Sequence, residues 1–203
     1  MQIDISSNVS ALRATLDDIA RTQVPFATAL ALTGAAKQAQ ADIRAQMPSI
    51  FDRPTPFTLN GIATTPARKS DLTASVFVKD VQAKYLGIEE DGGTRSPAGT
   101  ALVIPVDAKV NAYGNMTKNQ IATLLARPDV FSGVVNGIAG IWQRPLRGKK
   151  GQIKRPIRLL VAYEKSATYR PRFGFVDRVT KSVNASLPGL LNAAIARALT
   201  SKR

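Results

Sequence analysis

The chain has 203 residues, contains no histidine and no cysteine, and carries a net charge of +14. Without these two residue types it has no imidazole general base, thiol nucleophile, disulfide or thiolate metal site, so an enzyme built from it would depend on carboxylates, lysines or hydroxyls. Residues 1–107 carry ten Lys/Arg and eleven Asp/Glu, whereas residues 108–203 carry eighteen and three. This asymmetry predicts a polyanionic or acidic partner that faces one end of the molecule.

The length fits a single domain with extended arms. We expect a helical part over residues 1–48, a sheet-rich part over residues 52–163 and a C-terminal helix over residues 173–203. No run of about 18 apolar residues is present, so no membrane span is expected. The opening residues have neither the basic stretch nor the apolar core of a signal peptide. We therefore expect a soluble protein that is made in the cytoplasm and is used there or carried out within an assembly.

Apolar residues at three- and four-residue spacing predict two helices at the start of the chain. The first stripe comprises Val9, Leu12, Leu16 and Ile19. Thr22 can cap the second helix, which tolerates Pro25 in its first turn and is expected to end at Pro48. The second stripe comprises Phe26, Ala29, Leu30, Thr33, Ala36, Ala39, Ile43 and Met47. Its alanines would let a neighbouring element approach closely.

The middle of the chain predicts short strands. Pro54 and Pro56 rule out a helix and predict an extended segment over residues 52–62. Strands are expected over three further segments, separated by turn signals, with a flexible glycine-containing loop at residues 92–99. The three segments are residues 72–79, 85–89 and 101–106.

A short helix and a hairpin are expected next. Thr117 opens the helix, with Gln120 as the partner residue of a capping box, and Pro128 stops it. Strands over residues 130–135 and 138–143 flank the hairpin turn signal Asn136–Gly137. The segments that follow are expected to be a basic loop at 144–155, a strong strand at 157–163 and a polar linker at 166–172.

Apolar residues recur every four positions from residue 175 to residue 199 and predict a long amphipathic helix. Pro188–Gly189 interrupts the series and predicts a kink or break. The apolar face is expected to form a subunit interface. Its residues are Phe175, Val179, Val183, Leu187, Leu191 and Ile195.

The order of these elements predicts an α+β fold. It would have N-terminal helices, a mainly antiparallel sheet with one inserted short helix, and a long C-terminal amphipathic helix.

Seven cations without an acid among them mark residues 144–158. They are Arg144, Arg147, Lys149, Lys150, Lys154, Arg155 and Arg158. Contact with nucleic-acid phosphates is one interpretation, because lysine and arginine neutralise phosphates and release counterions. Docking on an acidic protein surface, or a solvated loop with no partner, are the alternatives. Trp142, just before this segment, could stack on a base of single-stranded nucleic acid or belong to the core.

The one acidic cluster is Glu89–Glu90–Asp91. Paired carboxylates can perform acid–base catalysis or hold Mg²⁺, but three consecutive residues cannot all face one point, and no second acidic cluster completes a site. We interpret the cluster as a solvated turn or as an ion-pair partner for an arginine of a neighbouring subunit. The chain has no phosphate-loop motif. We expect no catalytic residue, no metal and no cofactor.

Three segments resemble known phage proteins. Val24–Leu32, continuing into Ala35, Ala36 and Ala39, resembles the N-terminal helix of tailed-phage minor tail proteins of the lambda Z type, which also end in a long helix with basic residues. Tyr85–Thr94 is similar to the Tyr…Glu-x-Gly-Thr strand and loop of neck and tail-completion proteins of HK97-like phages, with three acids and an extra glycine where that family commonly has one acid. Arg170–Phe173 is similar to the proline-rich motif of that family.

This resemblance implies a non-enzymatic virion protein that forms a ring, expected to be a hexamer, at the head–tail junction. The implied partners are copies of the chain, the tail tube or tail terminator, and the head connector, with genomic DNA in the lumen facing the basic loop. It implies assembly in the host cytoplasm. A free, sequence-independent nucleic-acid-binding protein is the main alternative, and a carboxylate-dependent hydrolase is a third hypothesis.

Overall fold

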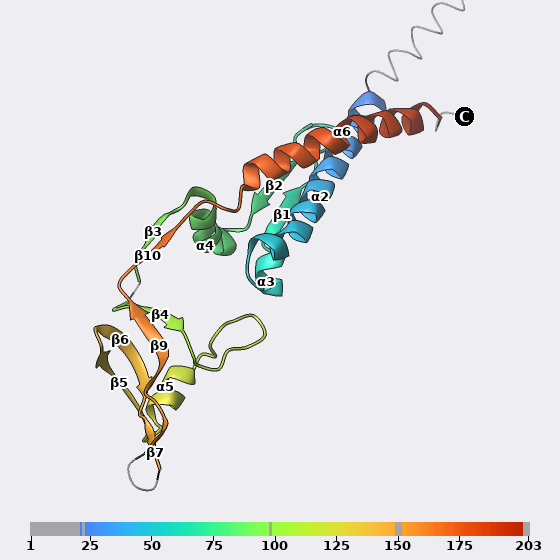
Figure 1. Cartoon of the computed structure of the whole chain (residues 1–203). Helices are drawn as coiled ribbons and strands as arrows, with labels where there is room; N and C mark the ends of the chain where they lie inside the picture. Colours follow the sequence, from blue (N-terminus) through green and yellow to red (C-terminus); the bar gives the residue numbers. More distant parts are fainter. Residues whose placement is uncertain (1–20, 22, 98, 149–151, 201–203) are drawn as a thin grey trace, which may run out of the picture. The chain divides into compact units, whose positions relative to one another are not determined.

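The structure is a computed structural model that describes residues 21, 23–97, 99–148 and 152–200 (Figure 1). The chain divides into two compact units, which differs from the single domain predicted from its length. Unit 1 comprises residues 1–50, 56–85 and 173–203, and unit 2 comprises residues 51–55 and 86–172. The stripe at residues 9–19 and the cap at Thr22 lie outside the described residues.

Unit 1 combines two long helices with a two-stranded hairpin. Its elements are α2 (Val24–Ile50), α3 (Pro56–Leu59), β1 (Ile62–Thr65), β2 (Ser75–Val78), the first half of α4 (Asp80–Asp91) and α6 (Phe175–Thr200). Together with the antiparallel strands of unit 2 they confirm the α+β class and the long C-terminal helix.

Helix α2 buries most of the predicted stripe, but in its first turns it buries a different row of residues from the one predicted. Its buried residues follow a four-residue repeat of small side chains that ends in two large ones: Ala27, Ala31, Ala35, Ala39, Ile43 and Met47. Ala29 and Ala36 are also buried, whereas Phe26 and Leu30, both placed in the predicted stripe, are exposed. A row of small side chains lets a neighbouring helix approach closely. The neighbouring helix therefore packs against the alanine row and not against the bulkier one.

That neighbouring helix is α6, which lies beside α2 in Figure 1. Alanines near the start of α2 and the end of α6 form one buried cluster: Ala27, Ala31, Ala194 and Ala198. Farther along, Ser182 Oγ donates a hydrogen bond to Asp42 Oδ2 at 2.5 Å, and Arg178 Nη1 donates to Gln46 Oε1 at 2.5 Å. The start of one helix thus meets the end of the other, so the two helices run antiparallel.

Two prolines do not interrupt these helices as expected. Helix α2 continues past Pro48 to Ile50, and α6 runs unbroken through Pro188–Gly189 to Thr200. A proline removes one backbone hydrogen bond and crowds the preceding turn. In α6, Leu187, Leu190 and Leu191 pack against the alanine cluster on either side of the proline, and this packing offsets the lost bond.

The hairpin of unit 1 pairs β1 with β2 in antiparallel register, Ile62 opposite Val78. It confirms the strand predicted at 72–79 in a shorter form. The prediction that residues 52–62 contain no helix is wrong, because Pro56–Leu59 form the short helix α3. Pro56 stands at the first helical position, where its missing N–H costs nothing.

Unit 2 is built on a four-stranded antiparallel sheet in the order β4–β9–β6–β5. Its core contains Val130, Ile141, Leu160 and Val161. The elements of unit 2 are the second half of α4, β3 (Gly93–Arg95), β4 (Leu102–Pro105), α5 (Gln120–Leu125), β5 (Val130–Val135), β6 (Ile138–Gln143), β7 (Leu146–Arg147), β8 (Ile153–Arg155), β9 (Arg158–Glu164) and β10 (Ala167–Tyr169).

The hairpin β5–β6 has the predicted bounds. Asn136 and Gly137 both have positive φ, 49° and 80°, as a two-residue type I′ turn requires. Strand β6 is central, and a bulge interrupts its pairing with β9 between Ile141 and Trp142. At Gly140 an added Cβ would stand 2.2 Å from the carbonyl oxygen of Val161, so only glycine fits this close approach of two strands.

The strand predicted at residues 85–89 is wrong, because this segment belongs to helix α4. Gly92 ends the helix in the left-handed region at φ 73°, and its N–H donates to the carbonyl of Ile88 at 2.9 Å. This is a common helix stop that glycine adopts without steric cost. The apolar residues of the segment therefore follow a helical rather than an alternating pattern.

Three segments predicted as loops or linkers contain strands. The 92–99 loop holds β3 and the 166–172 linker holds β10, and these pair antiparallel with Thr94 opposite Thr168. The basic loop holds β7 and β8. The short helix does not open at Thr117 as predicted: α5 begins at Gln120, and its N-cap residue, Asn119, makes no side-chain capping hydrogen bond. The N–H of Thr117 does donate to Gln120 Oε1 at 3.0 Å.

Candidate functional site

The predicted basic loop is a two-stranded hairpin of unit 2. Strands β7 and β8 pair antiparallel, with Leu146 opposite Arg155, and place Arg147 on one strand and Lys154 on the other. Lys149 and Lys150 lie outside the described residues. Leu146 and Ile153 are also exposed on this hairpin. We call residues 144–158 the basic hairpin.

Two of the seven cations are held by acids of the same unit. Arg158 pairs with Asp107, Nη2 to Oδ2, at 3.1 Å. Arg155 Nη2 lies 3.9 Å from Asp129 Oδ2. No ion pair to Arg144, Arg147 or Lys154 occurs among the described residues, so of the five described cations these three are the best placed to meet an external anion.

Asp129 organises the base of the basic hairpin. Arg127 binds its two carboxylate oxygens from Nε and Nη2 at 3.1 and 2.7 Å, and Gln143 Nε2 donates to it at 2.6 Å. These hydrogen bonds, those of Arg127 first, lower the pKa of Asp129 to about 2. The same contact raises the pKa of Arg127. The backbone N–H of Arg144 also donates to the carbonyl of Asp129 at 2.7 Å, which fixes the start of the hairpin.

Aromatic residues near the basic hairpin are structural. The Arg144 guanidinium lies 4.8 Å from the centre of the Phe131 ring, a cation–π contact. Trp142 is only 7% exposed, on the central strand β6. It therefore belongs to the core and has no face to offer to a nucleic-acid base.

The acidic cluster lies in the last turn of α4 and not in a turn between strands. Glu89 accepts two hydrogen bonds from Arg172, at 2.5 Å from Nε and 3.1 Å from Nη2, and this contact raises the pKa of Arg172. The Arg172 guanidinium also lies 5.4 Å from the centre of the Phe51 ring. The cation that pairs with Glu89 thus comes from the same chain, and no arginine from a neighbouring subunit is needed there.

The predicted subunit-interface residues of α6 pack first within the chain. Leu187, Leu191 and Ile195 contact the alanine cluster between α2 and α6. Phe175, Val179 and Val183 are half-buried on the same helix. A contact of this face with another subunit stays a prediction.

The difference in charge between the two halves of the sequence does not become a difference in sign between the two units, because both units carry a net positive charge. Unit 1 has thirteen Lys/Arg and seven Asp/Glu, a net charge of +6, and unit 2 has fifteen and seven, a net charge of +8. The reason is that residues 173–203 belong to unit 1 together with residues 1–50. The basic hairpin, and not half of the molecule, is the local concentration of positive charge.

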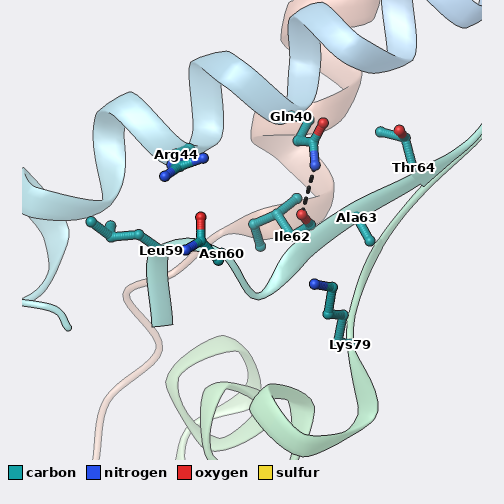
Figure 2. A pocket seen from close by; sticks show the side chains of 8 residues that line it. All are labelled: Gln40, Arg44, Leu59, Asn60, Ile62, Ala63, Thr64 and Lys79. Atoms are coloured by element: carbon teal, nitrogen blue, oxygen red, sulfur yellow. Dashed lines mark hydrogen bonds between the residues drawn. The ribbon is translucent and has the colours of Figure 1, made fainter. Parts of the chain in front are cut away.

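A polar pocket of about 430 Å³ lies in unit 1 between α2, α3 and β1. Figure 2 shows Arg44 on the α2 side and Lys79 on the hairpin side, with Asn60 directly after α3. Gln40 closes part of it by donating a hydrogen bond from Nε2 to the carbonyl of Ile62 at 2.7 Å. The lining includes cations and amides but no carboxylate, a composition that offers no acid–base pair.

A second, apolar pocket in unit 1 was missed from the sequence. It lies between α2 and the loop after β1 and has a volume of about 380 Å³. We call it the apolar groove; its lining residues are Phe26, Ala29, Leu30, Thr33, Pro66, Ala67, Arg68 and Lys69. One signal in the sequence could have indicated this groove: the first turns of α2 carry two apolar rows, one of alanines and one with Phe26 and Leu30. Only one row could face α6, so the bulkier row lies on the outer surface.

Within the described residues, no group of three or more Asp or Glu side chains is arranged to hold a metal ion. None of the described helices is long and apolar enough to cross a membrane. The chain matches no protein-family model, no curated protein and no solved structure.

Proposed function

We propose that this chain is a structural protein of a tailed-phage virion, which assembles with copies of itself into a ring at the head–tail junction. The resemblance of Val24–Leu32 to minor tail proteins supports this identity, and that segment opens the long helix α2. The second resembling segment, Tyr85–Thr94, is helical to Asp91, unlike the strand of the family it is similar to, and adds less support.

The observation that carries the proposal is apolar surface on the edge strands of unit 2. Val103 and Ile104 of edge strand β4 are 43% and 40% exposed, and Val134 of edge strand β5 is 67% exposed. Ile138 beside β5 is exposed as well. Edge strands normally carry charges or are covered, because open edges with apolar side chains pair with other chains. A protein that works in an assembly has a use for such edges.

A ring follows if the contact is between unlike surfaces. Heterologous contacts close into rings when the rotation between neighbours divides a full turn. Native mass measurement and particle imaging of the purified chain, alone and with tail tubes, test this. We expect closed rings that bind tube ends. A chain that stays monomeric at all concentrations and does not bind tubes would contradict the proposal.

A matched pair of variants ties assembly to the edge strand. Ile104→Lys places a charge on the β4 edge and should reduce assembly to smaller species. Leu125→Lys is the control, because Leu125 is similarly exposed, at 42%, but lies on helix α5. Equal assembly of both variants would show that the β4 edge is not an interface.

Sequence-independent nucleic-acid binding is the second candidate function. Arg144, Arg147 and Lys154 of the basic hairpin favour it. Each neutralised phosphate adds about 0.9 to the magnitude of the salt slope of duplex binding. Changing all three to Gln should lower that slope by up to about 3 and weaken all sequences alike. Arg155→Gln with Arg158→Gln should lower it less, because acids already hold both side chains. Equal slopes for both variants would exclude the hairpin as the phosphate contact.

A further inference from the structure

The apolar groove is a surface of unit 1 that the rest of the described chain leaves uncovered. Phe26 and Leu30 line one wall and are 48% and 46% exposed, and Pro66 and Ala67 line the other. The opposite face of α2 is occupied by α6 through the alanine cluster. The first turns of α2 thus have small side chains inside and large apolar ones outside, the reverse of a helix whose outer face meets only water.

The walls of the groove are held by hydrogen bonds. The N–H of Ala67 donates to Thr33 Oγ1 at 3.0 Å and ties the loop to α2. Arg68 and Asp71 exchange two backbone hydrogen bonds, at 2.8 and 3.1 Å, and fix the loop beyond it. Lys69 Nζ stands 5.1 Å from the centre of the Phe26 ring. The groove is therefore preformed and apolar at its base, with cations on the loop side.

The first twenty residues of the chain have the matching chemistry. Their sequence predicts one apolar stripe, Val9, Leu12, Leu16 and Ile19, which needs cover. Asp17 and Asp18 adjoin the stripe and are complementary in charge to Arg68 and Lys69. We propose that the apolar groove binds residues 9–19 of a second copy of this chain.

The connection between the segment and α2 favours a second copy over the same copy. Arg21 and Gln23, just before α2, are both helical. Few residues are therefore left between Ile19 and α2 in which the segment could reverse direction to lie in the groove of its own chain. Antiparallel helices are joined by loops of about two to five residues. A neighbouring copy imposes no such constraint.

This contact is heterologous, because each copy offers one segment and one groove, and contacts of this type close into rings when the rotation between neighbours divides a full turn. It would supply one interface of the proposed ring. Its test uses only the purified chain and a peptide, so it fails or succeeds independently of any phage role and of the β4 edge.

The first measurement is binding of a fluorescently labelled peptide of residues 5–20 to the full chain carrying Leu16→Asp, whose own segment is disabled. We expect saturable binding, weakened at least tenfold when Leu30→Glu is added. Leu72→Glu is the matched control, since Leu72 is 44% exposed in unit 1 outside the groove, and it should leave binding unchanged. No saturable binding, or equal weakening by both changes, would overturn the proposal.

A charge exchange tests the complementary rim. Lys69→Glu in the acceptor should weaken the peptide several-fold, and a peptide with Asp17→Lys and Asp18→Lys should recover the loss. A peptide that binds Lys69→Glu unchanged would remove the rim from the contact.

The native mass of the full chain shows whether the segment in the groove comes from the same chain or from a second copy. If a second copy supplies it, Leu16→Asp and Leu30→Glu each reduce the number of copies in the wild-type assembly, and Leu72→Glu does not. Peptide binding together with unchanged wild-type mass in both variants would mean that each chain fills its own groove, and the second-copy proposal would be wrong.

Discussion

The two units are stabilised by different interactions. All five ion pairs among the described residues lie in unit 2. Unit 1 instead packs two helices through alanines and joins them by hydrogen bonds in which one partner is uncharged, Ser182 to Asp42 and Arg178 to Gln46. We infer that unit 1 depends on the volume of its buried side chains, whereas unit 2 depends on strand geometry and on charge.

Two optical signals separate the units. Far-UV circular dichroism is dominated by helices α2 and α6 of unit 1. Trp142 is the single tryptophan of the chain and lies in the sheet of unit 2. Changes confined to one unit should therefore move one of the two unfolding transitions more than the other.

The largest effect is expected from the core of unit 1. Ile43 is fully buried on α2, and Ile43→Ala should lower the free energy of unfolding by about 4 kcal/mol through lost burial and a cavity. Denaturant titration should show a larger shift of the helical signal than of Trp142 fluorescence. Val81→Ala, at a site 59% exposed in the same unit, should change it by less than about 0.5 kcal/mol. Equal shifts of both signals would show that the units unfold together.

The next largest effect is expected from a substitution that disrupts the sheet of unit 2. Gly140→Ala should cost about 3 kcal/mol, because its Cβ would meet the Val161 carbonyl. The shift should appear chiefly in Trp142 fluorescence. Gly133→Ala on β5 is the control, since its Cβ would meet only the Phe131 ring at 3.5 Å, an ordinary contact. Similar costs at both positions would contradict the close approach of β6 and β9.

A smaller effect is expected at Arg172. Arg172→Lys loses the two-pronged contact with Glu89 and the contact with the Phe51 ring, and should cost about 1 kcal/mol. Arg170→Lys, two residues earlier and exposed, should be neutral. If the Arg172→Lys variant unfolds at the same denaturant concentration as wild type, the geometry of the guanidinium contributes nothing to the stability of unit 2.

The smallest effect is on acid stability. The pKa of Asp129, about 2 in the folded chain, lies below its ordinary value of 3.8. The ionised carboxylate therefore stabilises unit 2 above about pH 4, and this contribution is lost as the pH falls toward 2. Between pH 5 and pH 2 the Trp142 transition of wild type should fall further than that of Asp129→Asn. Identical pH profiles would show that the ionised carboxylate adds no stability.

Local signals in the sequence predicted what local interactions decide. The Asn136–Gly137 turn fixed both strands of its hairpin, because such a turn needs no distant partner. Strand β9, predicted at 157–163, is present at 158–164. The α+β class followed from the order of these elements.

Features that depend on a distant partner were missed. The buried face of α2 was chosen by α6, far away in the sequence, so Phe26 and Leu30 were assigned to the wrong side. Strands β3 and β10 are short, and their pairing residues, Thr94 and Thr168, stand 74 positions apart. The pairing of Arg155 and Arg158 with acids likewise could not be read from the run of basic residues.

The packing of α2 on α6 also sets an order of events during synthesis. Its polar contacts join residues 132 and 140 positions apart, and all of unit 2 is translated between the two helices. Contacts of such separation form late, because a long loop must close before they are gained. As the chain leaves the ribosome, unit 2 can complete its sheet while α2 still waits for α6. The last helix to be made is thus the one that completes unit 1.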